Sequence, residues 1–172
     1  MRIRDGNGGD VPAVLGMFDG AVAWLTARGR TGQWGSRPFS ADPARVERVT
    51  SWAASGGMRI AEIDGEPTGC AVLGSPMDYV APAPEPELYV QALVIDQRFR
   101  GHGVGSELLA RARSEAAERG VSLLRVDCYA GDDGRLVAYY ESQGFTRTES
   151  LTVGEWPGQL LELRLPDPAG RV

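Results

Sequence analysis

The chain has little of what several large classes of protein require. It contains one histidine and two cysteines in 172 residues, which are too few ligands for a usual zinc site. We expect Cys70 and Cys128, which lie in separate apolar runs, to be reduced thiols in the core. No apolar run is long enough to span a membrane, and the N-terminus lacks the apolar segment of a secretory signal. The sequence therefore predicts a cytoplasmic protein with no metal site and no membrane partner.

Basic charge is also in short supply. The chain has 18 basic and 23 acidic residues, which gives a net charge of −5. A protein with this balance has no general basic field to attract nucleic acid, so we expect no nucleic-acid partner. Apolar residues make up 42 % of the chain, enough for one proper core. The length predicts a single domain over residues 1–166, with a frayed tail at 167–172.

The hydrophobic pattern predicts a mixed arrangement of strands and helices. Asp10 and Asp42 are expected as helix N-caps, and the prolines of residues 74–86 predict an irregular surface loop. Turns are expected at 64–67 and at Pro157-Gly158. The predicted strands are 3–4, 58–63, 68–73, 87–96, 122–128, 145–153 and 159–165, and the predicted helices are 10–29, 42–55, 103–119 and 135–143.

The most informative segment is Arg100-Gly101-His102-Gly103-Val104-Gly105-Ser106. It follows the apolar run Leu88–Asp96 and precedes an amphipathic helix. Alternating glycines let the backbone curl tightly and approach a ligand closely. The free N–H groups of such a turn and of a helix N-terminus bind anions, and arginine suits phosphate. A strand, this loop and a helix together predict a diphosphate-binding site.

The spacing of the glycines decides between kinds of diphosphate site. No Gly-Lys-Ser/Thr sequence is present, which excludes a Walker A loop. A dinucleotide fingerprint needs a glycine where Ser106 or Leu108 stands. The pattern Arg-Gly-x-Gly-x-Gly does fit, beginning at Arg100. A register beginning at Arg98 also fits the shorter pattern, but the apolar stripe of the helix starts at Val104 and favours Arg100.

This pattern resembles the acetyl-CoA loop of the GNAT-type N-acetyltransferases, Gln/Arg-x-x-Gly-x-Gly/Ala. A second segment, Tyr-Tyr-Glu-Ser-Gln-Gly-Phe at 139–145, resembles the Tyr-Glu-x-x-Gly-Phe of the same family. The resemblance covers roughly residues 57 to 165. It implies an α/β (α+β) fold, with a mixed, mostly antiparallel sheet flanked by helices. The fourth and fifth strands, here 87–96 and 122–128, would splay apart around acetyl-CoA.

The resemblance also implies roles for particular residues. Tyr140 would be the acid that protonates the leaving thiolate, with Tyr139 as a packing aromatic. Asp133 stands where the family commonly has asparagine, and a carboxylate can accept but cannot donate a hydrogen bond. The implied cofactor-binding residues are Leu93, Val94, Ile95, Arg100, Gly101, His102, Gly103, Val104, Gly105, Ser106, Asp133 and Tyr140.

The acceptor side is less defined. Glu87 opens the central strand and is a candidate base and substrate contact, although a solvated charge beside Glu85 is nearly as good an interpretation. His102 is expected to be a loop residue. Gln33, Trp34 and Trp156 lie in predicted loops and are candidates for the acceptor pocket. Trp24 and Trp52 lie in helical stripes, which favours a place in the core.

The hypothesis that follows is an acyltransferase that moves the acetyl group of acetyl-CoA directly to the primary amine of a small molecule. The acceptor would be an amine, amino sugar or amino acid. An N-acetyltransferase for peptides or proteins and a non-catalytic acetyl-CoA-binding module remain alternatives. A homodimer is left open.

Overall fold

The computed structural model describes residues 1–167, and its elements follow the expected order. The strands are β1 (Arg2–Asp5), β2 (Met58–Ile63), β3 (Glu66–Gly74), β4 (Glu87–Ile95), β5 (Leu123–Tyr129), β6 (Thr146–Val153) and β7 (Trp156–Arg164). The helices are α1 (Val11–Thr26), α2 (Pro43–Ala54), α3 (Val104–Glu118) and α4 (Arg135–Ser142). Short 3-10 turns are η1 (Gly8–Asp10), η2 (Phe39–Ala41), η3 (Gln97–Phe99) and η4 (Asp132–Gly134).

The strands hydrogen-bond in the order β1-β2-β3-β4-β5-β7-β6. Pairing is antiparallel for β1 with β2, β2 with β3, β5 with β7 and β6 with β7. Only β4 and β5, among these ladders of the described chain, run parallel. Their pairing extends from Glu87↔Leu123 to Val90↔Val126, while β4 continues to Ile95 and β5 to Tyr129. The expected mixed, mostly antiparallel sheet with diverging fourth and fifth strands is confirmed.

The chain forms two compact units. The first contains residues 1–72 and 92–108, and the second contains residues 73–91 and the chain from 109 onward. The expected single domain over 1–166 stays a prediction, and most of the expected frayed tail lies outside the described residues. None of the helices within residues 1–167 is long and apolar enough to cross a membrane.

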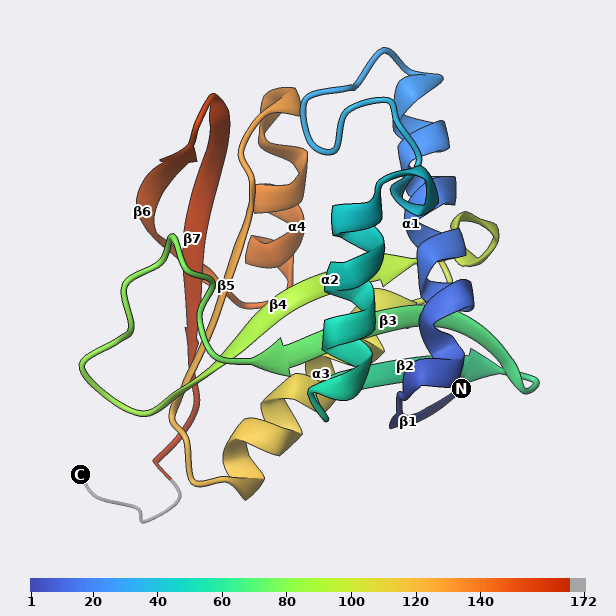
Figure 1. Cartoon of the computed structure of the whole chain (residues 1–172). Helices are drawn as coiled ribbons and strands as arrows, with labels where there is room; N and C mark the ends of the chain where they lie inside the picture. Colours follow the sequence, from blue (N-terminus) through green and yellow to red (C-terminus); the bar gives the residue numbers. More distant parts are fainter. Residues whose placement is uncertain (168–172) are drawn as a thin grey trace. The chain divides into compact units, whose positions relative to one another are not determined.

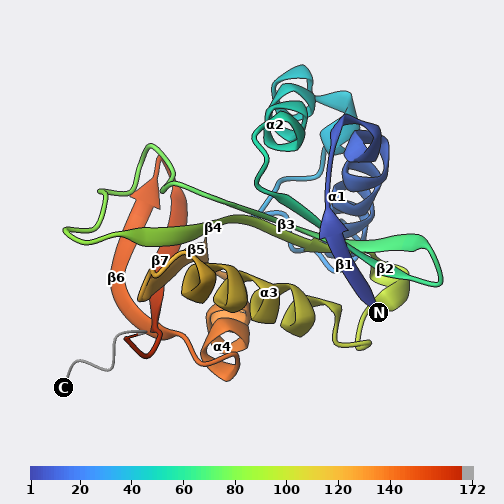
Figure 2. The same ribbon diagram turned by 90° about the horizontal axis from the view of Figure 1, so that it is seen from below.

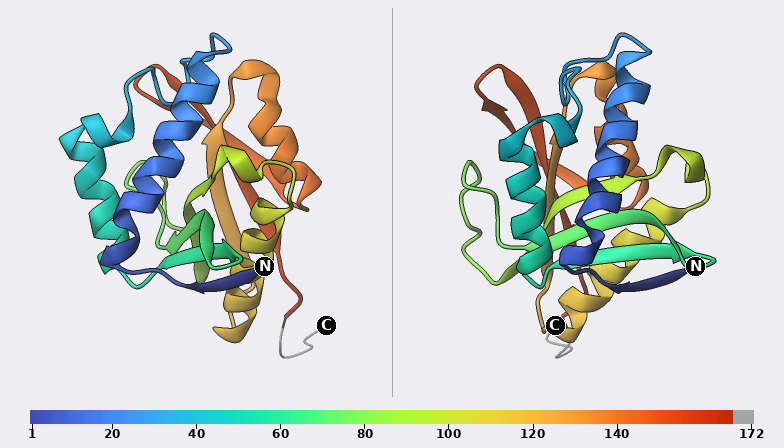
Figure 3. Two further views of the ribbon diagram at one scale, coloured as in Figure 1. Left: turned by 90° about the vertical axis from the view of Figure 1, so that its right-hand side faces the viewer. Right: turned by 45° about the vertical axis from the view of Figure 1, so that its right-hand side comes forward.

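In the first unit, α1 and α2 lie side by side and cover one face of β2 and β3 (Figures 1 and 3). Because side chains alternate along a strand, Ile60, Cys70 and Val72 point to that face and pack with Phe18 and other helix residues. The intervening residues pack on the opposite face with the first turns of α3. This second cluster has Ala61, Ala71, Val104 and Leu108 at its centre.

In the second unit, α3 and α4 cover the same face of the strands (Figure 2). Leu124, Val126 and Cys128 alternate along β5 and are buried, as are Val137 and Tyr140 of α4. On the other side of these strands, Val80 of the 75–86 loop packs with Tyr89 and Leu160. Both cysteines of the chain are free and buried, as expected.

One predicted turn was wrong. The connection between β6 and β7 is at Gly154-Glu155, where Gly154 has a φ of 60°. Pro157 and Gly158 instead belong to β7 and pair with Thr152 and Leu151. The physical reason is a close approach, because a Cβ at Gly158 would lie 2.5 Å from Leu151 Cδ1. This glycine serves packing inside a strand rather than a turn.

The two predicted N-caps had different outcomes. Asp42 caps α2 as expected, since its side chain accepts from Ala44 N at 3.0 Å. Asp10 precedes α1 but makes no side-chain cap bond to it. Its carboxylate instead accepts from Asn7 N and from the Arg4 guanidinium, and the Arg4 bonds hold the pKa of Asp10 below its usual range. The expected capping role of Asp10 is therefore corrected to an anchor for β1.

Candidate active site

The glycine-rich loop ends at the N-terminus of α3. Gly101 and Gly103 have φ values of 80° and 76°, a left-handed conformation in which other residues suffer a Cβ clash. The first bond of α3 runs from Glu107 N to Gly103 O at 3.1 Å. The four preceding N–H groups, those of residues 103–106, therefore lack an acceptor within the helix. Together with the helix dipole they form an anion cradle.

This cradle fits a diphosphate. A Cβ built on Gly101 or Gly103 would meet nothing within 4 Å, so a ligand can approach the loop backbone there. These features support the register that begins at Arg100, because it places Gly103 at the first free N–H of the helix and Gly105 in its first turn.

Arg100 stacks on an aromatic side chain that the sequence analysis expected in the core. Its Cζ lies 3.8 Å from the ring centroid of Trp24, and the Cζ of Arg28 lies at the same distance. Trp24 is only half-buried, and the helix that carries it, α1, passes beside the loop between β4 and α3 (Figures 1 and 3). The core expectation for Trp24 is thus corrected. Its spacing of four from Arg28 was the available signal.

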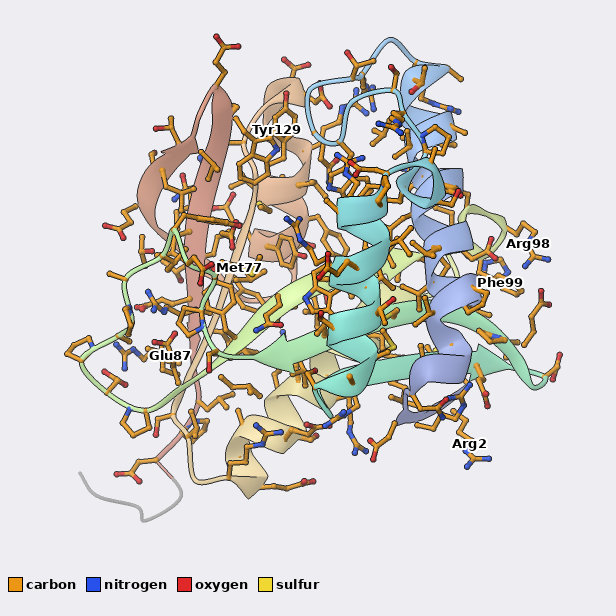
Figure 4. All side chains as sticks on the ribbon, viewed as in Figure 1. Arg2, Met77, Glu87, Arg98, Phe99 and Tyr129 are labelled. Atoms are coloured by element: carbon orange, nitrogen blue, oxygen red, sulfur yellow. The ribbon has the colours of Figure 1, made fainter. Side chains whose placement is uncertain are left out.

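Other residues of the loop have local partners. Arg98 forms ion pairs with Asp96 at 2.7 Å and Glu66 at 2.6 Å, and it extends outward beside Phe99 (Figure 4). His102 is exposed, and its ring lies 5.7 Å from that of Phe99. The structure therefore gives Arg98 a surface role, and it leaves His102 in the loop as predicted.

Residues 93–95 are the remaining predicted cofactor-binding residues that belong to the first unit. Val94 is buried among the α1–α2 cluster, and Leu93 and Ile95 pack on the opposite face with Val104. All three lie beyond the last β4–β5 pair, Val90↔Val126. Because their side chains pack on either face, the backbone is what this stretch can offer to a pantetheine arm, and that contact stays a prediction.

Tyr140 belongs to the second unit and faces its core. The side chain is buried and contacts the rings of Tyr139 and Phe145 at centroid distances of 5.4 and 5.7 Å. Burial raises the pKa of the Tyr140 phenol well above its usual range, and Cys128 adds to this shift. The phenol therefore keeps its proton at neutral pH, which a proton donor requires.

Asp133 lies in a strained turn before α4. Asp132, Asp133 and Gly134 have φ values of 54°, 61° and 72°, three consecutive residues in the left-handed region. Aspartate tolerates this conformation better than most residues. A carboxylate immediately before a helix is also stabilised by the helix dipole, which accounts for an acidic residue at this position. Its contact with the cofactor remains a prediction.

Glu87 is held by an arginine. Arg125 Nε and Nη2 donate to its two carboxylate oxygens at 2.7 and 2.9 Å, and Ala83 N donates to it at 2.5 Å. Both side chains of the pair are buried. Figure 4 shows Glu87 where the loop that carries Met77 joins β4. Both carboxylate oxygens of Glu87 are therefore occupied by donors from the protein itself.

A second carboxylate on the same face was missed by the sequence analysis. Asp127 lies two positions after Arg125 on β5, so the two side chains share one face of the strand and Cys128 lies on the other. Asp127 also comes directly after the last β4–β5 pair. Its oxygens accept from the hydroxyls of Tyr79, at 2.8 Å, and Tyr89. The signal was present, because Asp127 is the one acidic residue in the apolar run 123–129.

The three predicted acceptor residues are divided between the two units, with Gln33 and Trp34 in the first and Trp156 in the second. Trp34 packs on Phe18 and Phe39 at centroid distances of 5.4 and 5.7 Å, so it supports the α1–α2 cluster. Gln33 lies beside it and is half-buried. Trp156 begins β7 rather than lying in a loop, and its ring is 5.7 Å from Tyr129. The loop assignment of Trp156 is corrected, and it belongs to the second unit.

The acetyltransferase (GNAT) family model matches residues 24–145, most of the chain. The chain belongs to this family, which confirms the resemblance, and acetyl-CoA is the cofactor of the family.

Individual relatives agree with this assignment. Acetyltransferase Atu2258 of Agrobacterium fabrum is 41 % identical over 64 residues, which cover 37 % of this chain and 44 % of that protein. Less than half of the relative's length is therefore matched.

Solved structures are similar over nearly the whole chain. Ribosomal-protein-alanine N-acetyltransferase from Brucella melitensis has a TM-score of 0.69 and 24 % identity, covering 96 % of this chain and 100 % of that chain. The yncA protein from Salmonella typhimurium, solved with its cofactor acetyl-CoA, has a TM-score of 0.66 and 21 % identity, covering 96 % and 94 %. At these identities the likeness shows a shared fold.

Proposed function

We propose that the protein is an N-acetyltransferase that uses acetyl-CoA to acetylate the primary amine of a small molecule. Family membership supports the activity, and the N–H cradle at residues 103–106 fits the diphosphate of the cofactor. Acetyl-CoA, when bound, supplies an acetyl thioester. Residues 93–95 and 100–106, with Asp133, are the groups of this chain that would hold it.

The observation that carries the choice of a small acceptor is the fixed 75–86 loop. Gln91 Nε2 donates to Ser75 O at 2.8 Å, Arg125 donates to Ala81 O at 2.9 Å, and Ala83 N donates to Glu87. Arg164 pairs with Glu85 at the far end of the loop. A loop attached along its whole length supports a site of fixed shape better than an open groove for a peptide chain.

We assign the acceptor cation to Asp127 rather than to Glu87. Asp127 accepts from two tyrosine hydroxyls and has no cationic side chain within hydrogen-bond reach among the described residues, whereas Glu87 already has Arg125. An ionised carboxylate suits a protonated amine. Water would carry the amine proton away. Tyr140, whose phenol stays protonated, would supply a proton to the departing thiolate.

Direct transfer is supported by the state of the two thiols. An acetyl-enzyme on cysteine needs a thiolate. Burial raises the pKa of both Cys70 and Cys128 to about 12, so neither is ionised at neutral pH. The acceptor amine would therefore attack the thioester itself.

Thiol release from acetyl-CoA, measured with a panel of small amines and N-terminal peptides, tests the proposal. Small amines should give turnover and Asp127→Asn should raise the KM for the amine while leaving acetyl-CoA binding unchanged. Turnover with peptides alone would establish the protein acetyltransferase instead. Tight acetyl-CoA binding without turnover on any acceptor would favour the non-catalytic module.

A further inference from the structure

Three arginines gather around one indole on the first unit. The Cζ atoms of Arg28 and Arg100 lie 3.8 Å from the Trp24 ring centroid, and that of Arg30 lies 6.0 Å away. Arg28 also donates from Nη1 to Trp24 O at 3.0 Å. Distances of this size are typical of cation–π stacking. We call Trp24, Arg28, Arg30 and Arg100 the indole–arginine cluster.

The cluster has a concentration of positive charge that needs an explanation. Within residues 1–167, neither Arg28 nor Arg30 forms an ion pair with a carboxylate. Arg98, only two residues from Arg100, forms two such pairs. Like charges repel at these separations, and the chain as a whole is acidic at −5. An arrangement of this kind is suited to binding an anion.

The helix end explains only part of the arrangement. Arg28 and Arg30 follow the last residue of α1, Thr26, where a cation is favoured by the helix dipole. Arg100 comes from a distant part of the sequence and has no such reason to stack on Trp24. The indole therefore brings a residue of the glycine-rich loop together with the charges at the end of α1.

We infer that the indole–arginine cluster binds the 3′-phosphate of coenzyme A and that Trp24 is the positioning residue for Arg28 and Arg100. This inference rests on the proposed use of acetyl-CoA. The backbone N–H groups of residues 103–106 already provide for the diphosphate. Coenzyme A carries one further phosphate, the 3′-phosphate of its ribose, and the N–H cradle at residues 103–106 is assigned to the diphosphate and not to this group. Arginine forks match its oxygens, and Arg100 connects the cluster to the loop.

The test compares coenzyme A with 3′-dephospho-coenzyme A by isothermal titration calorimetry. Arg28→Ala should weaken coenzyme A binding by roughly tenfold, the value of about one charge-assisted hydrogen bond, and should leave the dephospho compound unaffected. Arg98→Ala, in the neighbouring turn and exposed, is the matched control and should change neither affinity.

Two results would overturn the inference. One is unchanged coenzyme A affinity in Arg28→Ala. The other is an equal loss of affinity for coenzyme A and for 3′-dephospho-coenzyme A, which would mean that the cluster binds the diphosphate instead. Wild-type protein that binds neither compound would instead contradict the proposed function, so the two failures are distinguishable.

Trp24 needs a readout of its own because it acts through the arginines. Trp24→Leu should show the same ligand-selective loss, and Trp24→Phe, which keeps an aromatic face, should recover part of it. Coenzyme A should change the indole emission of the wild type more than that of Trp24→Phe, and 3′-dephospho-coenzyme A should not. Equal loss in the Leu and Phe variants would contradict the stacking role. Circular dichroism checks that each variant is folded.

Discussion

The guanidinium of Arg125 donates to both carboxylate oxygens of Glu87, and the two side chains are 9 % and 8 % exposed. The paired residues stand on neighbouring parallel strands, and the same arginine reaches the loop carbonyl of Ala81. The pair therefore fastens the 75–86 loop to β4 and β5.

Glu87→Gln should destabilise the fold, because it leaves the Arg125 charge buried without its partner. We expect a loss of about 3 kcal/mol in the free energy of unfolding, measured by urea denaturation. Glu85→Gln is the control and should change the free energy of unfolding far less, since the Arg164–Glu85 pair is exposed and water screens such pairs. A stable Glu87→Gln variant with an altered pH–rate profile would restore Glu87 as the base.

Gly103→Ala should weaken acetyl-CoA binding while the protein still folds. The new Cβ adds strain at a φ of 76° and enters the side of the loop open to the ligand, so we expect a loss of roughly tenfold or more. Gly120→Ala has the matching strain, at a φ of 67° beyond the other end of α3. Calorimetry should show normal binding in the Gly120 variant, and a similar effect of both changes would mean that strain alone is responsible.

Tyr140→Phe should lower kcat by roughly 10²-fold with little change in acetyl-CoA affinity, because it removes the proton donor and almost no volume. Tyr139→Phe is the control. If that variant lost more activity than Tyr140→Phe, the register of this motif would be wrong.

The pH dependence of turnover gives a separate check on Tyr140. Burial raises the pKa of the phenol, so the protonated form persists to higher pH than in a free tyrosine. Wild-type kcat should therefore show no loss from this group up to about pH 10. A fall in kcat near pH 8 that disappears in Tyr140→Phe would contradict the raised pKa.

Both cysteines should react slowly with iodoacetamide in the native protein. Burial raises the pKa of each thiol to about 12, compared with about 8.5 for a free cysteine, so at pH 8 the thiolate fraction falls by roughly 10³-fold. Mass spectrometry should find no labelling of folded protein and two labels after denaturation. Rapid native labelling of either thiol would reopen a covalent mechanism.

Local signals predicted most of the fold. Asp42-Pro43 marks a helix start through its own cap and proline geometry, and the glycine-rich loop with its flanking strand and helix was placed correctly. Gly158 misled the prediction because a glycine can serve either a turn or a close packing contact. Which of the two applies at Gly158 depends on Leu151 across the hairpin.

The candidate site was harder to predict because its key relationships are distant in sequence. Glu87 and Arg125 are separated by 38 positions, so nothing near Glu87 indicates that its charge is already paired. Trp24 was assigned to the core from the helical spacing of apolar residues. That spacing indicates which face of the helix a residue lies on, but it does not indicate which side chains stack on it. Asp127 becomes notable only when Tyr79 and Tyr89 are known to converge on it.

The attachment of the 75–86 loop through backbone atoms has a consequence for protein engineering. Ala81 contributes its carbonyl and Ala83 its N–H, and almost any amino acid supplies the same groups. Side chains at these two positions can therefore be randomised in a library without detaching the loop. Proline at 83 is the exception, because it has no N–H to give to Glu87. The attachment of the loop therefore does not depend on the side chains at these positions. If the loop lines the acceptor site as proposed, directed evolution of acceptor preference should start at these two positions.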